Sequence, residues 1–136
     1  TAAVSPDSRW IAFARDLAGR SEILVRRFPD GDRDYRVSVD GGLTPVWSRD
    51  GRDLFFRRAD AVLAARVRVE GGDLVAERPR ELFRGAYVLQ DRHEWSYDPT
   101  TDELIMIVEG DREISRDRFV VVSDWRAGVA ETTTEP

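Results

Sequence analysis

Short apolar runs separated by polar turns recur along the 136-residue chain. None of these runs keeps the i, i+3, i+4, i+7 spacing of an amphipathic helix over three turns. In residues 10–14 and 104–108 the odd-numbered and the even-numbered positions are both apolar. In residues 35–39 and 65–69, by contrast, apolar and polar positions alternate strictly. The first pattern predicts strands buried on both faces, and the second predicts strands with one face in water. We therefore expect an all-β fold.

A short turn phrase occurs three times, each time beside an apolar run. Its copies are Ser5-Pro6-Asp7-Ser8-Arg9-Trp10, Ser48-Arg49-Asp50-Gly51-Arg52-Asp53 and, more weakly, Asp98-Pro99-Thr100-Thr101-Asp102-Glu103. The copies lie about 40 to 50 residues apart, which is the period of β-propeller blades. Because a propeller ring usually has at least four blades, the pattern predicts three blades that form a sector of a ring.

The apolar runs also predict where the strands of each blade lie. The first blade, about residues 2–39, has strands at 2–5, 10–15, 22–28 and 35–39; the second, about 44–83, at 45–48, 53–58, 62–69 and 77–83; the third, about 93–125, at 94–97, 103–108 and 118–125. The last blade thus lacks its outer strand. The polar residues 130–136 predict a disordered tail after a partial propeller of residues 1–129.

The segment that joins the first two blades resembles the blade junction of TolB-type, WD-like propeller repeats. It reads Asp40-Gly41-Gly42-Leu43-Thr44-Pro45-Val46-Trp47-Ser48-Arg49-Asp50-Gly51-Arg52-Asp53-Leu54-Phe55-Phe56. The rest resembles the C-terminal part of the propeller regions attached to bacterial eukaryotic-type serine/threonine kinases, through Arg27-Phe28-Pro29, Glu81-Leu82-Phe83, Tyr97-Asp98 and residues 120–125. The resemblance implies part of a six- or seven-bladed propeller that serves interaction or sensing, without catalytic residues. It also implies an extracytoplasmic or periplasmic part of a bacterial membrane protein.

The turn phrase departs from the Ser-Pro-Asp-Gly of these repeats at the glycine. Ser8 and Thr101 take its place in the first and third copies. Glycine tolerates a positive φ in such a turn, and β-branched residues such as threonine resist it. We expect either that these two turns have another shape or that Ser8 and Thr101 carry backbone strain.

Charge and composition exclude several classes of function. With 21 basic and 26 acidic residues the net charge is −5, so the attraction that drives nucleic-acid binding is lacking. The absence of cysteine removes disulfides and thiolate chemistry. No apolar run is long enough for a membrane segment within this chain. Because Thr1 stands where an initiator methionine would be, we expect a piece of a longer protein.

Candidate binding residues fall in the connections from one blade's outer strand to the next blade's inner strand. In propellers these connections surround the central channel, where ligands commonly bind. The candidates are Leu43 and Thr44 in the first such connection and Gln90, Arg92 and His93 in the second. A single histidine cannot form a typical zinc site, so we expect no metal and no cofactor.

Other residue groups have a simpler structural interpretation. The aspartates of the three turn phrases lie in separate turns rather than in one calcium loop, so they are expected to cap turns. Tryptophans at equivalent positions of the repeat, such as Trp47 and Trp95, are expected to pack in the core rather than to form a binding platform. The arginines of residues 57–84, among them Arg66 and Arg68, are interspersed with acidic residues and are expected on a mixed, solvated rim.

No nucleophile elbow, phosphate loop or dinucleotide fingerprint occurs, so we predict a non-catalytic module that is not an enzyme. Its partner would be a protein or peptide, a ligand that it senses, the remaining blades of the same protein, or a second copy that completes a six-bladed ring. One alternative is the propeller gate of a prolyl-oligopeptidase-type serine peptidase. A weaker one is a metal-dependent propeller hydrolase or lactonase.

Overall fold

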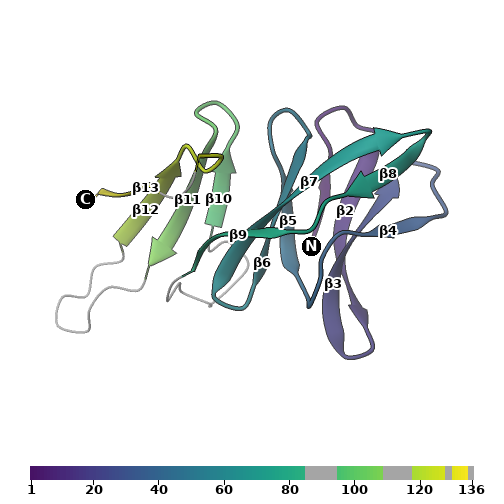
Figure 1. Cartoon of the computed structure of the whole chain (residues 1–136), viewed down its shortest axis with the longest axis horizontal. Coiled ribbons are helices and arrows are strands. Elements are labelled where there is room, and N and C mark those ends of the chain that lie inside the picture. Colours follow the sequence, from purple (N-terminus) through teal and green to yellow (C-terminus); the bar gives the residue numbers. More distant parts are fainter. Residues whose placement is uncertain (85–94, 109–117, 128–129, 135–136) are drawn as a thin grey trace. The chain divides into compact units, whose positions relative to one another are not determined.

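The computed structural model describes residues 1–84, 95–108, 118–127 and 130–134, and throughout these ranges the chain forms strands, turns and connections (Figure 1). In the described residues no helix is long and apolar enough to cross a membrane. The chain divides into two compact units, Thr1–Glu81 and Leu82–Pro136. The all-β architecture predicted from the sequence is confirmed.

The first sheet is an antiparallel meander in sequence order. Its strands are β1 (Ala2–Val4), β2 (Trp10–Leu17), β3 (Arg20–Arg27) and β4 (Asp34–Arg36). β4 is shorter than the predicted strand at 35–39 because Val37 and Ser38 leave the regular ladder, and both of their N–H groups donate to the carbonyl of Ile23. Each strand pairs with the next, as in a propeller blade.

The second sheet repeats this order with a shorter and earlier outer strand than expected. It contains β5 (Leu43–Trp47), β6 (Asp53–Arg58), β7 (Ala61–Glu70) and β8 (Asp73–Ala76), while β9 (Arg80–Arg84) also pairs with β7. The prediction of one outer strand at 77–83 is therefore wrong. Gly71 and Gly72 both have positive φ, so the chain reverses directly after β7 and β8 pairs back on it.

The third sheet has four strands, which corrects the expectation of a missing outer strand. They are β10 (Trp95–Asp98), β11 (Glu103–Val108), β12 (Arg118–Ser123) and β13 (Ala130–Thr134) in that order. β13 pairs antiparallel with β12 inside the segment expected to be a disordered tail. The polar threonines at 132–134 favour extended backbone because they are β-branched, and an outer strand needs main-chain pairing more than an apolar face.

The core of the first unit lies between its two sheets. Alternate residues of β6 and β7 face it, among them Leu54, Phe56 and Leu63, and they pack with Ile23 and Val25 of β3 in one buried cluster. Trp10 and Trp47 are buried members of the same cluster, which confirms the prediction for Trp47. Trp95, at the equivalent position in β10, is only half-buried. The Trp47 indole N–H donates to the carbonyl of Ala3 at 3.0 Å, which ties the second sheet to the first.

The first two copies of the turn phrase have one and the same hydrogen-bond pattern. In the first, the Ser5 hydroxyl donates to Asp7 (2.6 Å), and the Arg9 N–H donates to the same carboxyl oxygen (3.1 Å). Ser48, Asp50 and Arg52 make the equivalent bonds in the second (2.7 and 3.0 Å). These aspartates cap their turns, as expected.

The glycine position of the phrase explains how the copies differ in backbone shape. Gly51 has a φ of 69°, and Ser8 has a φ of 59° at the equivalent position, so the first turn keeps its shape and a serine carries the unfavourable conformation. In the third copy the positive φ lies at Asp102 (60°) and not at Thr101. Aspartate tolerates this region better than a β-branched residue does, and the third turn takes a different shape.

Candidate functional site

Two of the predicted binding residues lie at the start of the first strand of the second sheet. Leu43 and Thr44 are the first residues of β5, directly after the connection from β4. The Leu43 side chain is 51% exposed, and Val39 on the same connection is 42% exposed. The other three predicted residues, Gln90, Arg92 and His93, lie outside the described residues. The described part of the candidate site is therefore the connection of residues 37–44.

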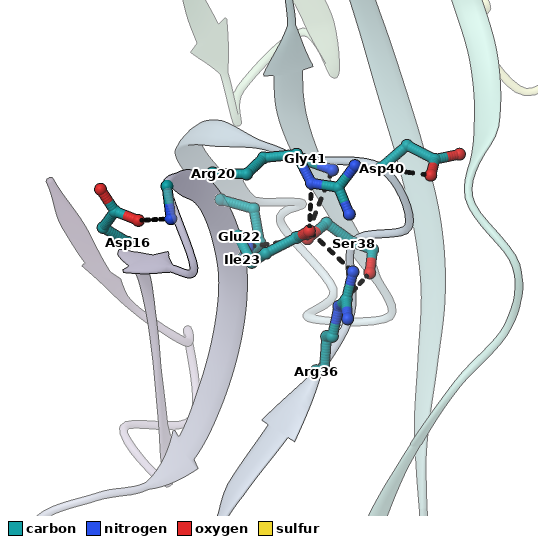
Figure 2. A network of polar contacts seen from close by, with 9 residues as sticks. Asp16, Arg20, Glu22, Ile23, Arg36, Ser38, Asp40 and Gly41 are labelled. Atoms are coloured by element: carbon teal, nitrogen blue, oxygen red, sulfur yellow. Dashed lines mark hydrogen bonds and ion pairs between the residues drawn. The ribbon is translucent and has the colours of Figure 1, made fainter.

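A buried carboxylate anchors this connection (Figure 2). Glu22 lies near the start of β3 with 1% of its surface exposed. One of its oxygens accepts hydrogen bonds from Arg36 (2.7 Å) and Arg20 (3.0 Å), and the other accepts from the Ser38 hydroxyl and the Gly41 N–H (3.1 Å). All of these donors lie in β3, at the end of β4 or in the connection. A single side chain thus fixes the course of the chain between the first two sheets.

Ser38 extends this network into the backbone. Its hydroxyl donates to Glu22 and also accepts from the Ile23 N–H at 2.8 Å. The hydroxyl therefore replaces a backbone acceptor at the point where β4 has left the ladder. Arg36 donates in addition to the carbonyl of Ser38 at 3.1 Å, so its guanidinium braces the same turn.

The surroundings of Glu22 keep it ionised. Burial alone would raise the pKa of this carboxyl, because a charge is poorly solvated in the interior. The hydrogen bond from Ser38, the charge of Arg36 and the bonds from Gly41 and Arg20 outweigh burial, and the pKa lies below its ordinary value of 4.5. At neutral pH the connection is therefore anchored by a fully charged group.

Gly42 brings the connection into close contact with the core. A Cβ at this position would lie 2.6 Å from Cγ1 of Ile23 and 2.9 Å from Cδ2 of Phe56, both of which are buried side chains. The Gly42 N–H donates to the carbonyl of Ser21 at 2.8 Å. The connection can lie this close to both sheets because residue 42 has no side chain.

Thr44 is held in a strained backbone conformation. Its φ is 48°, a region that β-branched residues rarely adopt, and the register of β5 against β6 shifts between Leu43 and Val46. Strain of this kind costs about 1 to 3 kcal/mol and persists where the surrounding structure imposes it. Such positions cluster at binding sites, and Thr44 stays a predicted site residue.

We expect Thr44→Asn to raise the free energy of unfolding by about 0.5 to 1 kcal/mol, because asparagine tolerates positive φ. Thr44→Val keeps the β-branch and should bring no gain. Urea unfolding of both variants measures the difference. If valine stabilises the chain as much as asparagine does, the strain at residue 44 is not the cause.

The comparisons with known proteins identify the fold. No family model and no curated protein matches the sequence. Solved structures do match. A protein assigned as TolB from Agrobacterium tumefaciens aligns with a TM-score of 0.63 and 18% identity, over 96% of this chain and 46% of that one. TolB from Acinetobacter baumannii aligns with a TM-score of 0.57 and 14% identity, over 98% of this chain and 31% of that one.

The chain has a TolB-like β-propeller fold. A protein assigned as a 6-phosphogluconolactonase from Bacteroides fragilis also aligns, with a TM-score of 0.58 and 16% identity over 99% of this chain and 37% of that one. The chain spans less than half the length of each of these three structures. Its antiparallel sheets correspond to propeller blades, and the connection of residues 37–44 runs from the outer strand of one blade to the inner strand of the next.

Proposed function

We propose that this chain is a non-catalytic propeller module that binds a protein partner through the connection of residues 37–44. The observation that carries the proposal is the exposure of two apolar side chains, Val39 at 42% and Leu43 at 51%, on a segment anchored by buried Glu22. Loops held on a rigid scaffold are the usual place for binding residues in such folds.

The anchoring supports a binding role because it lowers the entropic cost of association. Ordering a flexible loop on binding costs free energy, whereas a loop already fixed by hydrogen bonds to Glu22 does not incur that cost. Arg20 and Asp40 add charged groups beside the apolar ones, and their side chains are 55% and 68% exposed. An exposed apolar residue with a charged rim is the composition of a protein-interaction hot spot.

The wider context of the module follows from the resemblance and extends this proposal. The remaining blades of a six- or seven-bladed ring would come from the same protein or from a second copy of this chain. The protein would be a bacterial membrane protein, linked to a kinase, that presents the propeller outside the cytoplasm. The candidates Gln90, Arg92 and His93 would then line the next outer-to-inner connection.

Site-specific photocrosslinking tests the interaction. A benzophenone amino acid at position 43 should capture a protein partner from the source cells, and mass spectrometry identifies it. With the purified partner, we expect Leu43→Asp to weaken binding about tenfold or more, since a buried hot-spot contact is replaced by a charge. Val39→Asp should weaken it as well.

Val4 offers the matched control because it is an exposed valine, 46% accessible, in the short strand β1. Val4→Asp should leave the affinity for the purified partner unchanged. A partner whose affinity is the same for Leu43→Asp and for the unmodified chain would contradict the proposal.

The two enzymatic alternatives from the sequence stay predictions. The lactonase assignment belongs to a structure that shares 16% identity with this chain, and the likeness extends to the fold alone. In the part of the chain that the structure describes, no three histidine, cysteine, aspartate or glutamate residues are grouped as a metal site. Addition of calcium should raise the thermal stability if the lactonase alternative holds, and a peptidase would require a nucleophile elbow elsewhere in the protein.

A further inference from the structure

A second candidate site lies at the other end of the same two blades. A cleft of about 330 Å³ opens where the turn phrases of the first and second blades meet. Its floor is apolar and includes Trp10, Trp47, Val67 and Leu74. All of the residues that line it belong to the unit Thr1–Glu81. Leu43 is at the start of β5 and Trp47 at its end, so this cleft is separate from the connection of residues 37–44.

The register of β6 against β7 determines which charged side chains face this cleft. Asp53 pairs with Arg66. At the next pair of residues along the two strands, the carbonyl of Arg52 accepts a hydrogen bond from the Val67 N–H at 2.8 Å. Cross-strand partners lie on the same face of a sheet, and successive residues alternate. Because Val67 belongs to the core between the two blades, its partner Arg52 lies on the same face of the sheet as the core. Arg66 and Arg68 also line the cleft.

Arg52 is exposed and has no structural role that accounts for its charge. No ion pair joins its guanidinium to any other residue in the described ranges, although several other arginines there are paired. Arg66 pairs with Asp53 at 3.2 Å, and Arg68 pairs with Glu70 at 2.6 Å and with Glu77 at 3.2 Å. The charge of Arg52 is therefore available to a ligand.

The two aspartates at the cleft serve their own turns. Asp7 and Asp50 each accept a serine hydroxyl and a backbone N–H through one oxygen. Val69 completes the rim with an apolar side chain that is 54% exposed. The cleft thus combines an apolar floor and rim with a guanidinium, that of Arg52, which forms no ion pair with a described residue.

We propose that this cleft binds a short protein segment that places a large apolar side chain beside a carboxylate. The apolar side chain would fill the space above Trp10 and Trp47, and the carboxylate would pair with Arg52. The fork of N–H donors on a guanidinium matches the two oxygens of a carboxylate. This site goes beyond the proposed function, since it lies at the opposite end of β5 and uses other residues.

A set of capped tripeptides tests the proposal by NMR titration of the ¹⁵N-labelled chain. The probe is acetyl-Asp-Phe-Asp-amide, with Asn-Phe-Asn, Asp-Ala-Asp and Arg-Phe-Arg as its controls. We expect Asp-Phe-Asp to shift the amide signals of Val67 and Leu74. Asp-Ala-Asp should bind about tenfold more weakly because the apolar contact is lost, and Asn-Phe-Asn about fivefold more weakly because the ion pair is lost.

Arg52→Gln and the matched variant Arg78→Gln test whether the guanidinium of Arg52 binds the carboxylates of the peptide. Arg78 is exposed and does not line the cleft. We expect Arg52→Gln to weaken Asp-Phe-Asp binding about fivefold and to remove its advantage over Asn-Phe-Asn, whereas Arg78→Gln changes neither. The proposal is overturned if cleft signals do not shift, if Arg-Phe-Arg binds more tightly than Asp-Phe-Asp, or if the two variants behave alike. Leu43→Asp should leave tripeptide binding intact, which separates this result from the test of the proposed function.

Discussion

Replacing Gly42 with alanine is expected to lower the free energy of unfolding by about 3 kcal/mol. The added Cβ would lie 2.6 Å from Cγ1 of Ile23, well inside van der Waals contact, and 2.9 Å from the ring of Phe56. Both neighbours are fully buried in the core between the first two blades, so neither can move without displacing others. The connection would have to shift away from the core or the core would have to repack.

Gly71→Ala is the matched control for this prediction. Gly71 has a φ of 58°, and an added Cβ would have open space around it, so alanine there adds backbone strain of about 1 kcal/mol without steric overlap. Urea unfolding should therefore show a larger loss for Gly42→Ala than for Gly71→Ala. Equal losses would mean that the connection at residue 42 adapts and does not depend on the close approach to Ile23.

The turn phrases and the apolar runs carry enough information to predict the blades. Middle strands such as β6 and the first half of β7 are apolar because they are covered by neighbours, and this signal is local in the sequence. The capping role of Asp7 and Asp50 is local too, since each carboxyl bonds within its own turn. These features follow from side chains within a few residues of each other.

Outer strands were harder to predict because their stability comes from main-chain pairing. β13 has no apolar face in its sequence, and its pairing with β12 depends on a partner strand that already exists. For β8, the Gly71-Gly72 turn was the informative signal, since two residues with positive φ reverse the chain at once. The predicted strand at 77–83 followed the apolar residues Leu82 and Phe83 instead.

The anchored connection and the cleft both depend on contacts between distant residues. Glu22 resembles a surface residue in sequence, because Arg20 and Ser21 precede it, and its partners Ser38 and Gly41 lie far along the chain. The cleft arises because two equivalent turns meet at the end of the blades, as in the approach of Gly51 to Pro6. The positions of Trp10, Trp47 and Arg66 in the sequence carry no sign that these two turns lie side by side.

Glu22→Gln is expected to lower the free energy of unfolding by about 2 kcal/mol at neutral pH. Each carboxyl oxygen of Glu22 accepts two hydrogen bonds, so an amide in either orientation turns an NH₂ group toward two donors. The amide should direct its NH₂ toward Arg20 and Arg36, because their side chains are about half exposed and can turn to water. The buried Gly41 N–H and the Ser38 hydroxyl would keep an acceptor.

The loss caused by Glu22→Gln should also depend on pH in a defined direction. Burial would raise the pKa of Glu22, but its hydrogen bonds and neighbouring arginines hold it below 4.5 in the folded chain. A carboxyl with a lowered pKa stabilises the fold at pH values above its unfolded pKa, and this contribution is lost as the pH falls through the folded pKa. The difference between wild type and Glu22→Gln should therefore be constant near neutrality and shrink below pH 4.5.

Other carboxyls with lowered pKa, such as Asp7 and Asp34, are present in both proteins, so their effect cancels in this difference. Glu70→Gln supplies the control, since Glu70 is exposed and pairs with Arg68 at the surface, where the loss should stay within about 0.5 kcal/mol. Urea unfolding between pH 3 and pH 7 measures both variants. A difference for Glu22→Gln that stays the same across this range would show that the charge of Glu22 does not anchor the connection, and Leu43 would then be held by packing at Gly42 alone.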